Sequence, residues 1–176
     1  MTVQYLLENE LNHVMAALTP SNRLVCRLAL HTGLRIGDVL SLRTGQLRPH
    51  FWVTEAKTGK RRQIGIPSDL LVEILAQAGP VWAFPGRSPD RPRTRQAIWK
   101  DIKRAARAFR LPENVGCHSL RKVYAVRLME RYGDLERVRR ALQHSSPSIT
   151  IIYAMADKLM QERRRSRRSG RSCRRR

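Results

Sequence analysis

Five short segments of the chain hold side chains that could act on a phosphodiester. They supply arginine, lysine, histidine and tyrosine, which can neutralise phosphate charge, move protons or attack phosphorus. In chain order the segments are 32–38 (TGLRIGD), 57–60 (KTGK), 118–121 (HSLR), 142–146 (LQHSS) and Tyr153. Each segment alone has an ordinary interpretation as a surface arginine, a solvated lysine or a packed ring. Only the complete ordered set indicates a function.

The sequence lacks the motifs of nucleotide-dependent and metal-dependent enzymes. It has no G-x-x-x-x-G-K-[ST] cradle and no H-E-x-x-H zinc motif. Its 14 acidic residues stand against 35 basic ones and form no carboxylate cluster for a two-metal nuclease. We therefore expect no cofactor and no metal, and a bound phosphodiester would be neutralised by the protein's own cations.

The ordered set of segments resembles the phage integrase family of tyrosine recombinases. The family pattern is T-G-x-R with an acid three residues on, a K-T-G-K hairpin, H-x-L-R, L-x-H-S-S, and a tyrosine nine residues after that last histidine. All five parts occur here in order, with 23 residues from Arg121 to His144 and nine from His144 to Tyr153. The resemblance runs from about residue 20 to residue 158. It implies site-specific exchange of DNA strands.

The resemblance implies that three side chains hold the scissile phosphate. In-line attack adds negative charge to the non-bridging oxygens, and a guanidinium can bind them bidentately without losing its proton. The family pattern matches Arg35 and Arg121 to this clamp, with His144 as a third donor. Preorganised donors of this kind each contribute roughly 10²–10³ in rate.

The remaining implied roles are those of nucleophile, base and acid. Tyr153 would attack phosphorus, and it needs help to lose its proton because a free phenol has a pKa near ~10. His118 is the family's candidate base, and Lys57 resembles its general acid for the leaving 5′-oxygen. The product would be a 3′-phosphotyrosine ester, which can be rejoined without ATP or metal. Asp38, one helical turn after Arg35, is expected to orient neighbouring polar groups.

A basic helix over residues 94–110 is the candidate surface for duplex DNA. Its candidates for DNA contact are Arg95, Lys100, Lys103 and Arg104. In the resembling family a helix in this region lies against the major groove. A merely solvated amphipathic helix is an equal alternative interpretation. Trp82 and Trp99 are interpreted as core residues.

The elements that must position these residues are mostly helices. Helical spacing of apolar residues predicts helices over 3–18, 21–33, 36–42, 68–75, 94–110, 119–133 and 134–142, with a last one from Pro147. Ser21 and Thr94 are expected N-caps, and Gly33 is an expected C-terminal stop.

One hairpin interrupts the helices. Residues 51–56 and 62–66 predict two strands joined by a turn at Thr58 and Gly59, and residues 85–93 predict an irregular loop. The expected fold is mainly α (α+β): a helical catalytic domain of the DNA breaking-rejoining type with a small antiparallel β-hairpin on one side.

The charge of the chain makes double-stranded DNA its expected partner. The 176 residues carry a formal net charge of +21. The last 14 residues hold nine arginines, and without them 35 − 9 = 26 basic residues face 14 acidic ones, which leaves +12. We expect a tyrosine recombinase catalytic domain over 1–162 and an arginine-rich disordered tail over 163–176.

Cysteine usage and hydropathy indicate a cytoplasmic protein. Cys26, Cys117 and Cys173 form no C-x-x-C pair, which fits a reducing compartment. No segment approaches the ~20 apolar residues that a membrane span needs. We expect action near the nucleoid of a bacterial or phage-infected cell, and the resemblance implies a homo-oligomer on paired DNA sites.

Two other functions stay open on sequence alone. A type IB topoisomerase uses a related constellation, although the L-x-H-S-S segment and the short chain favour an integrase. A catalytically silent DNA-binding regulator could keep the same fold, although the intact Tyr153, Arg35, Arg121 and His118 argue against it. Only about 20 residues precede the resemblance, so the chain is expected to be a minimal recombinase or a fragment of a longer one.

Overall fold

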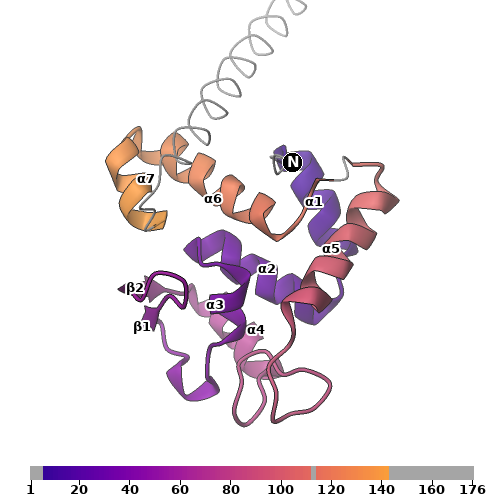
Figure 1. Ribbon diagram of the computed structural model, residues 1–176, viewed down its shortest axis with the longest axis vertical. Coiled ribbons are helices and arrows are strands. Elements are labelled where there is room, and N and C mark those ends of the chain that lie inside the picture. The colour runs from indigo at the N-terminus through magenta and orange to yellow at the C-terminus, as the bar shows by residue number, and fades with distance from the viewer. Residues whose placement is uncertain (1–5, 112–113, 143–176) are drawn as a thin grey trace, which may run out of the picture. The chain divides into compact units, whose positions relative to one another are not determined.

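The computed structural model of the protein describes residues 6–111 and 114–142, which fall into two units (Figure 1). The first unit ends at Tyr124 and the second begins at Ala125, inside helix α6 (Cys117–Tyr132). The other elements are α1 (Glu8–Ala17), α2 (Pro20–Thr32), α3 (Ile36–Leu40), the 3-10 helix η1 (Thr44–Gln46), β1 (His50–Thr54), β2 (Arg61–Gly65), α4 (Ser68–Gln77), α5 (Arg95–Ala108) and α7 (Leu135–Leu142). The expected fold of helices with one small hairpin is confirmed.

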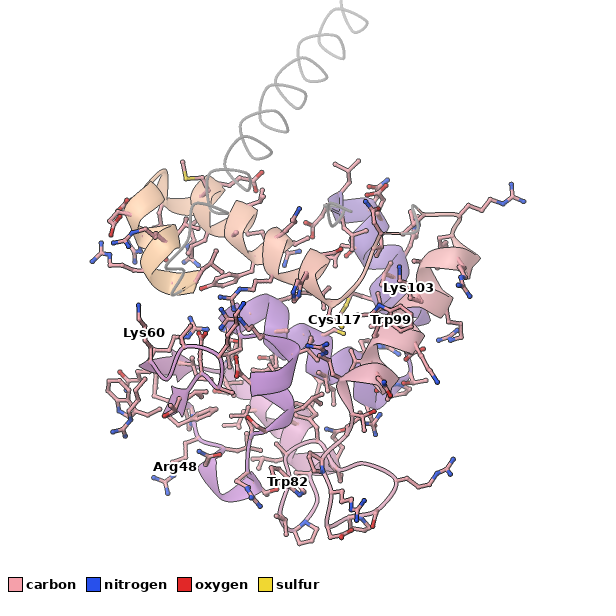
Figure 2. All side chains as sticks on the ribbon, viewed as in Figure 1. Arg48, Lys60, Trp82, Trp99, Lys103 and Cys117 are labelled. Carbon is pink, nitrogen blue, oxygen red and sulfur yellow. The ribbon has the colours of Figure 1, made fainter. Side chains whose placement is uncertain are left out.

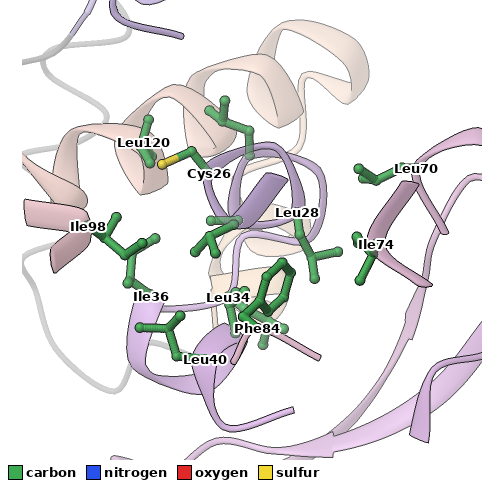
Figure 3. Close-up of a cluster of buried hydrophobic side chains, with 14 of the residues drawn as sticks. Cys26, Leu28, Leu34, Ile36, Leu40, Leu70, Ile74, Phe84, Ile98 and Leu120 are labelled. Atoms are coloured by element: carbon green, nitrogen blue, oxygen red, sulfur yellow. The ribbon is translucent and has the colours of Figure 1, made fainter. Parts of the chain in front are cut away.

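The core of the first unit forms around α2, which contacts α1, α3 and α4. Leu28 of α2, Ile74 of α4 and Phe84 of the following loop are fully buried and lie together (Figure 3). Ile98 brings α5 into the same cluster, and Leu120 brings α6. Burial of each such side chain stabilises the fold by roughly 1.5–3 kcal/mol.

The end of α2 is set by Gly33, as the sequence predicts. Gly33 has φ +67°, a left-handed conformation that glycine adopts without strain, and its N–H donates to the carbonyl of Ala29 at 2.8 Å. The ring of Tyr124 packs so closely that a Cβ on Gly33 would overlap Cε1 of that ring. The chain therefore leaves α2 in a fixed direction, toward Arg35.

The predicted cap of α2 is wrong, whereas that of α5 is confirmed. Helix α2 begins at Pro20 with Thr19 as N-cap, two residues earlier than a Ser21 cap would allow. The amide and hydroxyl of Thr19 both donate to the Asp101 carboxylate, at 3.0 and 2.9 Å. The Thr94 hydroxyl accepts the amide N–H of Ala97 at 3.1 Å and caps α5.

The two strands pair antiparallel, within two residues of the predicted ranges. The register places Phe51 opposite Ile64 and Val53 opposite Arg62. Phe51, Val53 and Ile64 are buried, while the alternate residue Trp52 is 50% exposed, as expected for a sheet with one covered face.

The interpretation of two tryptophans as core residues is wrong. Trp99 is 47% exposed, because it follows the buried Ile98 and so points about 100° away from the core around α5. Trp82 is only partly buried, and the Arg43 guanidinium lies 3.7 Å from its ring centre. Neither ring is therefore part of the buried core.

The second unit holds the end of α6 and all of α7. Gly133, at φ +63°, ends α6, and the Asp134 carboxylate accepts the amide N–H of Glu136 and of Arg137 at the start of α7. Val138 and Leu142 bury the inner face of α7. The predicted helix from Pro147 and the tail over 163–176 lie outside the described residues. Within the described ranges, no helix is long and apolar enough to cross a bilayer.

Candidate active site

Arg35 is presented by the junction between α2 and α3. It is the N-cap residue of α3, with φ −68° and ψ 147°, so its side chain leaves the helix at the point where the chain turns. Its Nη1 makes an ion pair with Glu55 and lies 4.0 Å from the Asp38 carboxylate. The guanidinium is thus held from one side.

Arg121 reaches the same junction from α6. Its side chain is buried, and its Nη1 donates to the carbonyl oxygen of Gly33 at 2.6 Å. Burial, followed by the nearby charge of Arg35, lowers the pKa of Arg121 to about 10. The guanidinium of Arg121 remains cationic at neutral pH. Because it binds the carbonyl of Gly33, two residues before Arg35, two positive guanidiniums from distant parts of the sequence lie close together.

The imidazole of His118 lies among cations. Its pKa is lowered below the ordinary value, first by burial and then by the charges of Arg121, Arg95, Arg35 and Lys57. Each of these effects disfavours the protonated ring. His118 is therefore neutral near pH 7, which is the form that can accept a proton from a phenol.

Lys57 is positioned by the turn of the hairpin. The amide N–H of Ala56, the preceding residue, donates to the buried Asp38 carboxylate at 3.0 Å. The orienting role expected of Asp38 is thus a contact between α3 and the hairpin. It places Lys57 against the N-terminal end of α3, where Arg35 also lies.

A pocket of about 680 Å³ is lined by three of these four residues. Its polar lining includes Arg35, Lys57 and His118, and Arg95, Trp99 and Lys103 of α5 form another part of its wall. Figure 2 shows Trp99 and Lys103 on α5 beside Cys117, the first residue of α6. The Lys103 ammonium lies 5.6 Å from the centre of the Trp99 ring. The pocket therefore has cations on both walls, with the Trp99 ring on the α5 side.

The four cationic candidates on α5 differ in their surroundings. Arg95 and Lys103 line the pocket, whereas Lys100 is exposed outside it. Arg104 is paired with Asp101 at 2.6 Å and also donates to the carbonyl of Ala17, so it joins α5 to α1. These contacts favour a structural role for Arg104 and leave Arg95 and Lys103 as the better candidates for DNA contact.

Sequence reasoning missed Glu55. This residue is completely buried, and its carboxylate faces Arg35 and, at 3.4 Å, Nε of Arg62. One signal was present: Glu55 is the only acidic residue between Asp38 and Asp69, and it stands two positions before Lys57. An isolated acid among bases indicates an ion pair, although it does not name the partner.

The structure brings four of the six expected site residues into one neighbourhood: Arg35, Lys57, His118 and Arg121. His144 and Tyr153 lie outside the described residues. Across residues 6–111 and 114–142, no group of three or more histidine, cysteine, aspartate or glutamate side chains could hold a metal ion.

Comparison with known proteins identifies relatives along most of the chain. "Probable integrase/recombinase YoeC" of Bacillus subtilis (strain 168) is 34% identical over 134 residues, which cover 73% of this chain and 74% of that protein. Tyrosine recombinase XerD of Lacticaseibacillus casei is 32% identical over 151 residues, which cover 75% of this chain and 49% of XerD.

Solved structures share the fold at lower identity. The catalytic domain of bacteriophage HP1 integrase aligns with a TM-score of 0.63 and 22% identity, covering 88% of this chain and 89% of that one. The XerH site-specific recombinase, bound to palindromic difH substrate, aligns with a TM-score of 0.70 and 22% identity over 93% of this chain and 52% of XerH. The chain thus spans about half the length of XerD and XerH.

The family assignment rests on the sequence match as a whole. The model of the phage integrase family matches residues 4–160, a range that includes all six expected site residues. The chain therefore belongs to the phage integrase family.

Proposed function

We propose that the chain is a site-specific recombinase or integrase, which cleaves and rejoins double-stranded DNA through a 3′-phosphotyrosine intermediate. One observation carries the proposal: Arg35, Lys57 and His118, spread over more than 80 positions of the sequence, line one pocket beside the buried Arg121. Cations arranged around a neutral imidazole suit a reaction in which a phosphate gains charge and a phenol loses a proton.

In the proposed reaction the Tyr153 oxygen attacks the scissile phosphorus and the bond to the 5′-oxygen breaks. His118 takes the phenolic proton, and Lys57 gives a proton to the leaving oxygen. Arg35, Arg121 and His144 bind the non-bridging oxygens. Reversal with a second 5′-hydroxyl releases Tyr153 and joins the new strand, so the number of phosphodiester bonds is conserved.

The proposed partners follow from charge and family. Arg95 and Lys103 extend the cationic lining of the pocket along α5, which suits the DNA backbone on either side of the scissile phosphate. Relatives of the same fold include a lambda integrase dimer bound to a COC′ core site. We infer a homo-oligomer on paired DNA sites, and action in the cytoplasm where such DNA is found.

Capture of the covalent intermediate tests the proposal. The substrates are nicked duplexes whose sequences are tiled across the DNA on either side of the gene. They trap the intermediate, because the short strand that is released with a free 5′-hydroxyl diffuses away. We expect wild-type protein to form a denaturant-resistant adduct, and Tyr153→Phe to lose it by at least about 10³-fold while binding duplex within about twofold. An adduct formed equally by Tyr153→Phe would refute the nucleophile.

A matched substitution controls for the loss of any tyrosine hydroxyl. Tyr132 is exposed on α6, and its ring face contacts the guanidinium of Arg137. Tyr132→Phe keeps that ring, so we expect wild-type adduct formation from it. A protein that binds duplex but never forms an adduct on any tiled substrate would instead be the catalytically silent regulator.

A further inference from the structure

Glu55 is a buried acid whose contacts all lead to the candidate active site. Its side chain is completely inaccessible, yet it faces two guanidiniums, those of Arg35 and Arg62. A buried carboxylate is unfavourable unless it is paired, and two partially buried arginines are equally unfavourable without a counter-charge. The three side chains therefore hold one another in a mutually dependent cluster.

The backbone of the same residue closes the turn that carries Lys57. The Glu55 N–H donates to the carbonyl of Lys60 at 3.0 Å, and the Glu55 carbonyl accepts the N–H of Gly59 at 2.9 Å. Movement of Glu55 would shift the turn. Its side chain and its backbone thus connect Arg35 with Lys57.

The second partner of Glu55 extends the connection to the other arginine of the site. Nη2 of Arg62 donates to the carbonyl of Thr32 at 2.7 Å, and the next carbonyl, that of Gly33, accepts from Arg121 at 2.6 Å. Glu55 therefore contributes to holding the α2–α3 junction against the hairpin. Its negative charge also opposes the mutual repulsion of the clustered guanidiniums.

We propose that Glu55 is a positioning residue of the site: its buried carboxylate holds Arg35 in the orientation that binds the scissile phosphate. The proposal deepens the proposed function and rests on it. Glu55 does not touch the phosphate, and it acts through Arg35.

The rate of adduct formation at saturating protein measures how much Glu55 contributes by positioning Arg35. Removal of a preorganised donor lowers such rates by roughly 10²–10³, so we expect about that loss for Arg35→Ala and a loss of about tenfold or more for Glu55→Gln. Glu55→Gln keeps the shape and an acceptor oxygen, which limits any loss of folding. Glu73→Gln is the matched control, because Glu73 pairs with Arg27 at the surface at 2.5 Å.

Two further measurements separate positioning from general loss of structure. A methylphosphonate at the scissile position lacks the negative charge that Arg35 neutralises. On that substrate we expect Glu55→Gln and Arg35→Ala to approach the wild-type rate together, within about threefold. In the double variant we expect no loss beyond that of Arg35→Ala, since residues that act as one unit are not additive.

The outcomes distinguish this inference from the function on which it rests. A Glu55→Gln rate within about twofold of wild type, an equal deficit on the methylphosphonate, or a deficit that multiplies with that of Arg35→Ala would each overturn the positioning role alone. Failure of wild-type protein to form any adduct would overturn the proposed function and this inference with it.

Discussion

The charge state of His118 determines at which pH the candidate base can work. Burial and four neighbouring cations lower its pKa below the ordinary value. The neutral ring accepts the phenolic proton, so adduct formation should rise as pH increases through this lowered pKa. The midpoint of this rise should therefore lie below about pH 6.5, the pKa of an unperturbed histidine.

Removal of one of the cations near His118 should shift the pH range over which the rate of adduct formation rises, here called the acidic limb, in a known direction. Arg95 disfavours protonated His118, so Arg95→Gln should raise the pKa of His118 and move the limb to higher pH. Single-turnover rates at saturating protein, measured between roughly pH 4.5 and 8, check this without interference from weaker DNA binding. Arg43→Gln is the control, because Arg43 lies over Trp82. Superimposable curves for Arg95→Gln and wild type would contradict the electrostatic account.

The sequence predicts some of these residues and not others for a physical reason. Arg35, Lys57, His118 and Arg121 stand in short motifs with fixed neighbours, so local patterns identify them. Glu55 matters only through partners 20 positions before it and seven after it. Such a partnership is created by the fold and leaves no local motif.

The junction after α2 should tolerate no side chain at Gly33. Gly33→Ala places a Cβ in a left-handed conformation, at about 1–2 kcal/mol, and against the Tyr124 ring, for which overpacking adds about 1–3 kcal/mol. We expect the free energy of unfolding in urea to fall by about 2–5 kcal/mol in total. In a Tyr124→Ala background only the conformational part should remain.

A second glycine provides the comparison for this experiment. Gly45 in η1 has no positive φ, and a Cβ added to it would meet no atom within 4 Å, so Gly45→Ala should change the unfolding free energy little. Equal effects of the two substitutions would mean that the left-handed turn at Gly33 does not control the junction. Because Gly33 also accepts from Arg121, the destabilised variant should lose adduct formation as well.

Element types were predictable, whereas helix starts and surface faces were less so. Periodicity located every described α-helix and the hairpin, and the glycine at the end of α2 was correctly interpreted. The cap of α2 was missed because Pro20 can occupy a first helical position, and because Asp101, 82 positions away, binds Thr19. Trp99 was misassigned because a large aromatic ring suggests a core, while the helical angle from Ile98 directs it outward.

Charge is the property through which the whole chain should recognise DNA. Binding that releases counterions weakens with salt, and the slope of log K against log salt is about −0.9 per phosphate contact. With a formal net charge of +21, of which nine charges are arginines in residues 163–176, this chain should show a steep slope. The slope, measured by fluorescence anisotropy on one duplex, reports the number of contacts.

A chain ending at residue 162 shows how much of the salt slope comes from the tail and how much from the rest of the protein. The truncated chain keeps a net charge of +12 and the pocket residues, so it should still bind duplex, with a slope shallower by several units. A full-length chain with nine lysines in place of the tail arginines should keep the steep slope, since phosphate attraction depends on charge rather than on guanidinium geometry. Adduct formation at saturating protein should be the same in all three, because the tail contributes to encounter and not to chemistry. Equal slopes for the truncated and full-length chains would place the DNA contacts entirely within residues 1–162.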